Sequence, residues 1–351
     1  MTDPQRPSFA APTCIVSRRQ WLRTAAGVGA SAAGLALVPE VHLFAEQLQD
    51  FIEGPPVPDV KPEQLSPHVW MVYAKDGFPN QENQGLMASI LFVVTQKGVV
   101  VMDSGASVQI GQMAIRMIKT VTPKPVIAVF NSHYHGDHWL GNHAFVQMCG
   151  QNLPIHALAH TRDQIAGHEG NLWRSLMERW TNQATLGTKV FAPNMVVEHG
   201  QVFDYGDVHL KMHFYGKAHT PSDLSIEVVQ DKLTYVADIA MENRIANMDD
   251  GSFPGTFKYY EELKKAAGDQ LWVPGHGRGS KDLLDTYGTF MKGIWEPCLQ
   301  AVKQGIPLSE AKPLVMKDPR VASRAKTMDG FDSNFGKYTS LAYLEAEKEA
   351  F

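Results

Sequence analysis

Three histidines and one aspartate fall within six residues of this 351-residue chain, in the pattern H-x-H-x-D-H from His133 to His138. The apolar run 125–130 leads directly into the pattern and is typical of a buried β-strand. Because α/β proteins place their chemistry at the carboxyl ends of such strands, the next side chains should point into a cleft. Imidazole and carboxylate groups are ligands of Zn²⁺ and Fe²⁺. The segment therefore predicts a metal site that includes His133, His135, Asp137 and His138.

A hydrated polar turn is the alternative interpretation of this segment. It is disfavoured because a chance cluster would crowd polar atoms beside an apolar strand without partners.

Three later residues occupy the same kind of position: His219, Asp238 and His276 each stand at the end of a strand-like run. The runs are 208–215, 233–237 and 270–273. Small or turn-forming residues follow each one, and glycine lets the backbone turn tightly around an ion. A lone histidine would be weak evidence, but the repeated arrangement indicates one shared metal site.

With these motifs the chain resembles the metallo-β-lactamase superfamily, from about residue 68 to about residue 290. The resemblance implies an α/β fold of the layered α+β type, an αβ/βα sandwich of two mixed sheets with helices outside. It also implies a dinuclear centre, with two Zn²⁺ per chain and Fe or Mn as alternatives. The implied ligands fall into two sets and one bridging residue: His133, His135 and His219; Asp137, His138 and His276; and Asp238 between them.

An earlier aspartate, Asp103, matches the early strand-end aspartate of the family. The resemblance makes it a candidate for a supporting residue behind the metal ligands. The alternative is a turn residue in front of the helix expected from Ser107.

The identity of the ligands also separates branches of the superfamily. Flavodiiron-type oxidoreductases carry Glu where His135 stands, so His135 favours a hydrolase. Class B1 β-lactamases carry Cys at the position of Asp238 and Lys three residues later, where this chain has Met241. Acyl-homoserine lactonases carry Tyr at that later position. The ligand set is most similar to that of the glyoxalase II-like branch.

Two adjacent divalent ions can share a hydroxide, and one Zn²⁺ already lowers the pKa of bound water to about 7. The resemblance therefore implies a hydrolase that uses a metal-bridging hydroxide on an ester, thioester, lactam or lactone of a small molecule. Asp137 would bind metal and orient the nucleophile. Two alternatives stay open: a mononuclear iron sulfur dioxygenase acting on a persulfide, and a β-lactamase-like protein with little turnover.

The first 45 residues differ in kind from the rest of the chain. Arg18 and Arg19 precede a run of small and apolar residues from 24 to 38, which is the twin-arginine export pattern. This run is shorter than the ~20 residues that span a bilayer. We therefore expect residues 1–45 to be a signal peptide, with folded export to the periplasm or beyond and no stable membrane insertion. An uncleaved N-terminal helix is the alternative.

The remaining organisation follows from composition. A net charge of −5 is a poor match for nucleic acid. The proline-rich stretch 55–58 predicts an extended linker over 46–67. A catalytic domain is expected over 68–304 and a C-terminal helical extension over 305–351. The sequence carries no signal for the oligomeric state. Cys149 and Cys298 could pair, but packing is the favoured interpretation for both.

Periodicity also predicts individual elements. A single helix is expected over 139–148, another over 161–180, and a strand over 195–202. The second helix places Trp173, Met177 and Trp180 on one face. That stripe is interpreted as core, with an aromatic wall over the pocket as the functional alternative.

Overall fold

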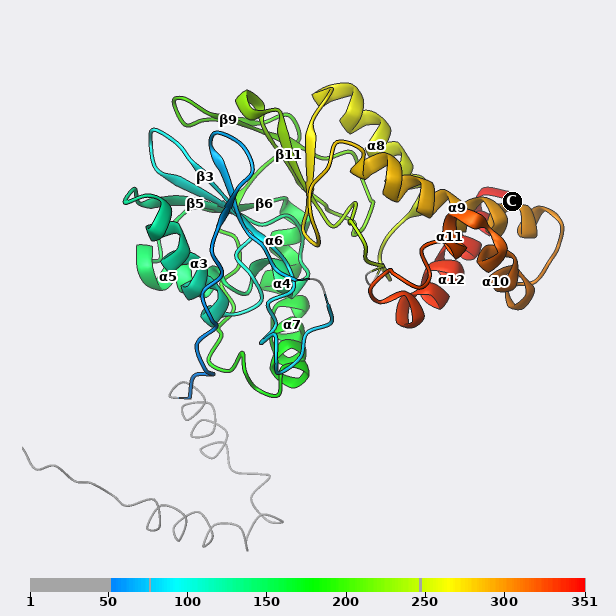
Figure 1. The fold of residues 1–351 in the computed structure, drawn as a ribbon, viewed down its shortest axis with the longest axis horizontal. Helices are drawn as coiled ribbons and strands as arrows, with labels where there is room; N and C mark the ends of the chain where they lie inside the picture. The colour runs from blue at the N-terminus through cyan, green and yellow to red at the C-terminus, as the bar shows by residue number, and fades with distance from the viewer. Residues whose placement is uncertain (1–51, 76, 246–247, 351) are drawn as a thin grey trace, which may run out of the picture. The chain divides into compact units, whose positions relative to one another are not determined.

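The computed structural model describes residues 52–75, 77–245 and 248–350, and the described residues from 53 onwards form one compact unit. The expected signal peptide, 1–45, lies outside the described residues. Two mixed β-sheets face each other, with helices on their outer sides (Figure 1). This is the layered αβ/βα architecture that the resemblance to the metallo-β-lactamase superfamily implies.

The first sheet has seven strands arranged in chain order. They are β1 (Glu63–Gln64), β2 (Val69–Val72), β3 (Ile90–Val94), β4 (Val99–Met102), β5 (Val126–Phe130), β6 (Ile155–Ala157) and β7 (Met195–Val196). Strands β1 to β4 pair antiparallel, whereas β4 to β7 pair parallel. The parallel part places the carboxyl ends of β4, β5 and β6 at one edge.

The second sheet has five strands in the order β12-β11-β10-β9-β8. They are β8 (Val202–Asp204), β9 (His209–His213), β10 (Ser225–Val228), β11 (Leu233–Ala237) and β12 (Leu271–Pro274). Only β11 and β12 pair parallel, and the other pairs are antiparallel. The parallel pair again brings two strand ends together.

Apolar side chains fill the space between the sheets, including Met102 and Phe130 from the first sheet and Met212 and Tyr235 from the second. Strands β4 and β11 are buried along their whole length. Their near-continuous apolar sequences follow from this, because both faces of each strand are covered.

Helices cover both outer faces. On the first sheet, α3 (Val108–Val121) and α5 (Asn142–Cys149) pack against a second apolar core. A third core joins α8 (Phe253–Ala267) and α9 (Leu283–Lys303) to the second sheet, and Figure 1 shows the last helices gathered around α9. The other α-helices of the described residues are α4 (Gly136–Trp139), α6 (Ala159–Ala166), α7 (His168–Trp180), α10 (Leu308–Lys317), α11 (Pro319–Ala322) and α12 (Phe331–Ala350).

Three local predictions were wrong. The helix expected over 139–148 is divided between α4 and α5, and the helix expected over 161–180 is interrupted at Gly167. The strand expected over 195–202 is two short strands in different sheets, separated by a turn at Gly200 (φ 80°). Because apolar residues lie on both sides of this turn, the sequence pattern is continuous and does not indicate that the chain passes from one sheet to the other.

The residues before the first strand pack against the body of the unit. Val57 is buried in the same core as α3, and Arg116 pairs with Asp59 at 2.7 Å. Residues 53–62 contain no regular helix or strand. Among the described helices, none is both long and apolar enough to cross a membrane.

Of the two cysteines after residue 45, only one is packed inside. Cys298 is buried in α9, whereas Cys149 is exposed at the end of α5. Both are free thiols, so the packing interpretation of Cys149 was wrong.

Candidate metal centre

The seven predicted ligands converge at one edge of the sandwich, and all of them are buried. Four come from the turn after β5 and from α4, which begins inside the H-x-H-x-D-H motif. His219 lies in the loop after β9, Asp238 directly follows β11, and His276 follows β12. Residues from distant parts of the chain meet because their strands end at the same edge.

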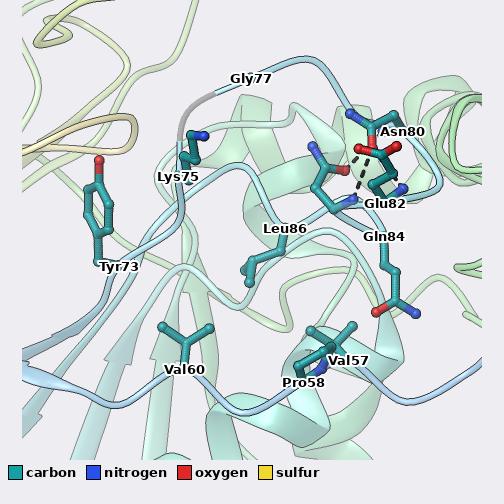
Figure 2. A pocket seen from close by; sticks show the side chains of 11 residues that line it. Val57, Pro58, Val60, Tyr73, Lys75, Gly77, Asn80, Glu82, Gln84 and Leu86 are labelled. Atoms are coloured by element: carbon teal, nitrogen blue, oxygen red, sulfur yellow. Dashed lines mark hydrogen bonds between the residues drawn. The ribbon is translucent and has the colours of Figure 1, made fainter.

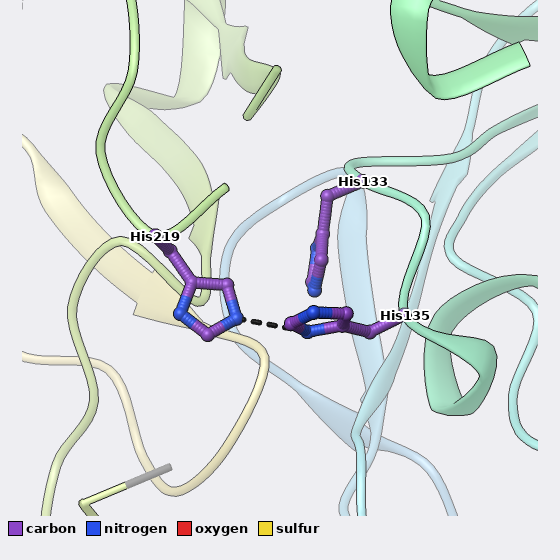
Figure 3. A group of neighbouring side chains, drawn as sticks. All are labelled: His133, His135 and His219. Atoms are coloured by element: carbon purple, nitrogen blue, oxygen red, sulfur yellow. Dashed lines mark hydrogen bonds between the residues drawn. The ribbon is translucent and has the colours of Figure 1, made fainter. Parts of the chain in front are cut away.

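Three groups of these residues have ligand atoms within 4.8 Å of one another. They are His133, His135 and His219; His133, His138 and Asp238; and Asp137, His138 and His276. Figure 3 shows the first group, with the three imidazoles turned toward a common centre. The groups overlap through His133 and His138, so the described donors form one continuous cluster.

Asp238 lies between the two outer groups. One of its carboxylate oxygens is 3.7 Å from His219 Nε2 and 3.3 Å from His276 Nε2. Its other oxygen is 3.4 Å from His138 Nε2. His276 Nε2 is also 3.2 Å from Asp137 Oδ2. A carboxylate at this position can reach ions held by either group.

Hydrogen bonds behind the rings set the orientation of three imidazoles. His138 Nδ1 lies 2.7 Å from Asp103 Oδ2, His133 Nδ1 lies 3.0 Å from Ser132 Oγ, and His276 Nδ1 lies 2.8 Å from the Met87 carbonyl. A carboxylate or carbonyl oxygen can only accept, so His138 and His276 donate through Nδ1. Their Nε2 atoms are thereby directed into the cluster, as in metal sites with fixed tautomers.

Several buried atoms of the cluster have no hydrogen-bond partner within the described structure. They include His133 Nε2, His138 Nε2 and Asp238 Oδ1. An unsatisfied buried polar atom costs about 1–3 kcal/mol. His135 Nδ1 and His219 Nε2 lie 3.0 Å apart and share one hydrogen bond, with one ring donating and the other accepting (Figure 3). Imidazole and carboxylate donors oriented in this way fit divalent metal ions, which would satisfy all of these atoms.

The local electrostatics divide the histidines into two classes. Burial lowers the pKa of His135 to about 4 and that of His219 to about 3, and it holds the pKa of His133 well below its usual range. These three rings are neutral at pH 7, which is the form that binds metal.

The other two histidines stand among carboxylates. Burial opposes their charge, but Asp238 and Asp137 raise the pKa of His138 well above its usual range. Asp238 likewise raises the pKa of His276 to about 9, against burial and the nearby charge of Arg244. In return, His138 and His276 hold the pKa values of Asp137 and Asp238 below the usual range despite burial. Bound cations would take the place of these protons, because ligating imidazoles are neutral.

Asp103 is not a simple turn residue, because its carboxylate receives four hydrogen bonds. Oδ2 accepts from His138 Nδ1 at 2.7 Å, from Ser132 Oγ at 2.7 Å and from Tyr235 OH at 2.6 Å. Oδ1 accepts from the Ser132 backbone N–H at 2.8 Å. Its φ of 57° lies in the left-handed region, which Asp and Asn tolerate better than most residues. Asp103 thus lies directly behind His138, where a supporting residue is expected.

Gly275 lets the chain pass very close to the cluster. A Cβ at this position would lie 2.4 Å from Asp238 Oδ1 and 2.7 Å from His138 Cε1. Any side chain there would displace two of the predicted ligands. Steric hindrance therefore favours glycine before His276, in addition to the tight turn that the sequence suggested.

A cavity of about 390 Å³ opens onto the cluster beside Tyr134, His135 and Asp137. One of its walls is apolar and is formed by α7 together with Phe78 and Pro79. The Trp173 ring lies 4.9 Å from the His135 ring, and Phe78 packs edge-on against Trp180 at 5.0 Å. Both interpretations of the α7 stripe are confirmed. Met177 is buried in the core that contains α3, Trp173 and Trp180 pack against that core, and all three residues also border the cavity.

Other residues that line the cavity are polar, and sequence reasoning missed them. Arg244, Asp249 and Asp250 come from the chain after Asp238, and Asn334 and Lys337 come from α12. None of them belongs to a motif. The one available signal was that Arg244 stands six residues after a predicted ligand, which is too weak to identify a pocket residue.

The loop that carries Phe78 also borders a second hollow, of about 490 Å³ (Figure 2). Figure 2 shows Tyr73, Lys75 and Leu86 around it, and the polar side chains of Asn80, Glu82 and Gln84. In this loop, Asn80 Oδ1 accepts from the backbone N–H groups of Glu82 and Asn83, at 2.8 and 2.9 Å. This part of the loop is an ordinary hydrogen-bonded turn, and its ligand-type residues lie outside the metal cluster.

Comparison with known proteins identifies the family. The model of the metallo-beta-lactamase superfamily matches residues 83–287, which is more than half of the chain. The chain therefore belongs to the metallo-beta-lactamase superfamily. No curated protein matches the sequence closely enough to be reported as a relative.

Solved structures share the fold at low sequence identity. A metallo-beta-lactamase from Pontibacter korlensis is 20% identical, with a TM-score of 0.52, and the match covers 64% of this chain and 95% of that one. A stereoselective inverting sec-alkylsulfatase from Pseudomonas sp. is 17% identical, with a TM-score of 0.64 over 82% of this chain and 50% of that one. This chain thus spans about half the length of the sulfatase. At these identities the likeness extends to the fold alone.

Substituting Gly275 by alanine should lower metal retention, because the new methyl group would push Asp238 and His138 apart. The measurement is zinc per chain by mass spectrometry after dialysis. Gly288→Ala is the matched control, because its Cβ would make only ordinary contacts with Tyr260 at 3.4 Å. Equal zinc content in the two variants would contradict the steric role of Gly275.

Replacing Asp103 by asparagine should weaken metal binding by about 10- to 100-fold, the range seen when a residue behind a ligand is changed. Asparagine tolerates the same backbone conformation but loses the negative charge that faces His138. Affinity is measured by competition with a chromogenic chelator. An unchanged affinity in a folded variant would show that Asp103 serves only the turn.

Proposed function

We propose that this protein is a metal-dependent hydrolase of a small-molecule ester, thioester, lactam or lactone. We further propose that two divalent ions, zinc first, are held by His133, His135, Asp137, His138, His219, Asp238 and His276. The observation that carries the proposal is the meeting of these seven buried donors, several of them without a hydrogen-bond partner, beside a cavity with an apolar wall. Membership of the superfamily supports the same reaction class.

Zinc at such a centre supplies Lewis acidity and brings the pKa of a bound water near 7. The protein's contribution is a fixed, largely dry arrangement around the reacting atoms. His138 and His276 hold the pKa of the Asp137 carboxyl below its usual range although burial opposes this. Asp137 is therefore ionised at neutral pH, and its carboxylate can accept a hydrogen bond from the attacking water and orient it.

The cavity also positions the substrate. The Trp173 ring lies beside the His135 ring, so an apolar part of a substrate that contacts α7 lies next to the first histidine group. Tyr134 OH donates to Asp250 at 2.7 Å, and burial together with this bond raises the pKa of Tyr134 far above its usual range. Tyr134 is therefore a neutral hydroxyl at the rim of the cavity and does not act as a base.

Replacing His133 or Asp137 by alanine should reduce the rate of hydrolysis by more than 100-fold. Substitution of a residue that only supports a ligand typically costs about 10- to 100-fold. The assay uses nitrocefin, S-lactoylglutathione, lactones, aryl phosphates, aryl sulfates and a secondary alkyl sulfate. His168→Ala is the control, because His168 lies outside the cluster and is exposed.

Metal content should be about two zinc ions per chain. One iron per chain together with oxygen consumption on a persulfide would instead support the dioxygenase alternative. Full activity of either alanine variant with verified metal content would refute the proposed roles. Bound metal without cleavage of any substrate in the panel would favour a protein with little turnover.

We also propose export by the twin-arginine route to the periplasm or beyond, on the basis of Arg18, Arg19 and the small, apolar run 24–38. Changing both residues to lysine should leave full-length protein in the cytoplasm of a bacterial host, as judged by fractionation and by the mass of the N-terminal peptide. Arg23→Lys is the control. Unimpaired export of the double variant would exclude this route.

A further inference from the structure

The wall that α7 contributes to the cavity combines aromatic rings with a carboxylate. Glu169, Trp173 and Trp180 all line the cavity. Because Glu169 and Trp173 are four residues apart, their side chains are neighbours on one face of the helix. Glu169 is partly exposed, and among the described residues no lysine or arginine forms an ion pair with it. The negative charge of Glu169 is therefore available to the cavity.

A second carboxylate lies at the same end of the cavity. The Tyr134 hydroxyl donates to Asp250 Oδ2 at 2.7 Å, and both residues line the cavity. Burial raises the pKa of the Tyr134 hydroxyl, and the charges of Asp250 and Glu169 raise it further. Both carboxylates are thus close enough to act on one hydroxyl. Glu169, Asp250, Tyr134 and Trp173 are called the acidic end of the cavity below.

The aromatic rings of the acidic end adjoin the metal cluster. The Tyr134 ring lies 5.2 Å from the His135 ring, and the Trp173 ring lies 4.9 Å from it. A ligand group at the acidic end is therefore next to a predicted metal ligand. The face of an aromatic ring carries negative potential and attracts cations, including quaternary ammonium groups. Rings and carboxylates at one place favour a positively charged group there.

The other carboxylates that line the cavity are already engaged. Asp249 pairs with Lys337 at 3.3 Å, so these two side chains add no net charge. Asp137 and Asp238 belong to the metal cluster. Asp238 is only 5% exposed, and its Oδ1 has no hydrogen-bond partner within the described structure. This buried, unsatisfied atom marks the cavity as a ligand site independently of the charges at its acidic end.

Arg244, the other basic residue of the cavity, is bound away from the acidic end. Its Nη1 donates to the Gly77 carbonyl at 2.9 Å. The next residue, Phe78, packs edge-on against Trp180 at 5.0 Å. Trp180 lies three helical turns after Glu169, ~16 Å along the axis of α7. The guanidinium is therefore held near the Trp180 end of the wall and does not neutralise Glu169.

We propose that the substrate carries a quaternary or protonated tertiary ammonium group, which the acidic end binds while the group to be hydrolysed lies at the metal centre. Trp173 supplies an aromatic face, and Glu169 and Asp250 supply negative charge. A cationic substrate needs this compensation, because it would otherwise be repelled by the metal ions. The inference rests on the proposed function in one respect, namely that this cavity is the substrate cavity. Glu169 and Asp250 are on this view specificity-determining residues.

The test is a binding measurement on the zinc-loaded full chain, which needs no turnover. The probes are choline and 3,3-dimethylbutanol, two alcohols of the same shape that differ in having a cationic nitrogen or a neutral carbon. Titrations at constant ionic strength use tryptophan fluorescence and, independently, calorimetry. Choline should bind at least about tenfold more tightly, as an aromatic face and nearby carboxylates together would give. The metal centre cannot produce this preference, because its charge repels choline.

Substitutions at the acidic end locate the preference. Glu169→Gln and Asp250→Asn should each weaken choline binding by about threefold and leave dimethylbutanol binding unchanged. The asparagine keeps an oxygen that can accept from Tyr134. The double variant should lose most of the preference. Trp173→Leu keeps an apolar wall without the aromatic face and should weaken choline binding more than dimethylbutanol binding.

Glu310→Gln is the matched control, because Glu310 is an exposed glutamate in the first turn of α10 and lies outside the cavity. A thermal melt checks the fold of each variant. Equal binding of the two alcohols, tighter binding of dimethylbutanol, or no binding of either would overturn the inference. So would a choline preference that persists in the folded double variant.

Failure of the proposed function is a separate result. Acetylcholine and 3,3-dimethylbutyl acetate are the matched esters for turnover and join the hydrolysis panel. A choline preference in a protein that cleaves nothing in the panel would count against the proposed function alone. Cleavage of both esters with equal kcat/KM, together with equal binding of the two alcohols, would support the hydrolase and refute the ammonium site.

Discussion

Burial of unpaired polar atoms at the edge of an apolar sandwich is the constraint on which this structure depends. His133 Nε2, His138 Nε2 and Asp238 Oδ1 lie in the interior without a hydrogen-bond partner in the described structure, and such atoms are costly. A fold can keep them only if the surrounding contacts are strong, and here three apolar cores supply those contacts. The cluster is thus assembled in advance, and a bound cation has little ordering left to impose.

The way in which the fold maintains the cluster is visible in its supporting residues. Each of three imidazole rings is held by a hydrogen bond on the side away from the cluster. Ser132 holds His133, Asp103 holds His138, and the Met87 carbonyl holds His276. Gly275 leaves room for the ligand-type side chains to approach one another. These features are not ligands, yet each decides where a ligand atom points. The superfamily fold therefore contributes orientation, while the motif residues contribute the donor atoms.

The cluster of candidate ligands could be predicted from the sequence because its members follow apolar runs, and such runs are visible in the local sequence. The sandwich architecture came from resemblance, and the structure agrees with it. Local patterns could not show that the chain passes from the first sheet to the second between β7 and β8, because apolar residues flank the turn on both sides. They also could not show that the stripe on α7 borders a cavity as well as a core, because both environments select the same residue types. The place of Arg244 could not be predicted, because the backbone of its neighbours Asn243 and Ile245 is hydrogen-bonded to Asp329 and Asn334, far along the chain.

The Asp103 carboxylate links the two sheets of the sandwich mechanically. It directly follows β4, and its partners are Ser132 and His138 from the first half of the sandwich and Tyr235 from β11 in the second half. One carboxylate thereby ties the two sheets together at the depth of the ligands. Any sliding of one sheet across the other would change the direction of the His138 ring. The metal centre should consequently be sensitive to shear between the two halves, and substitutions far from it that loosen the inter-sheet packing should alter its affinity for cations.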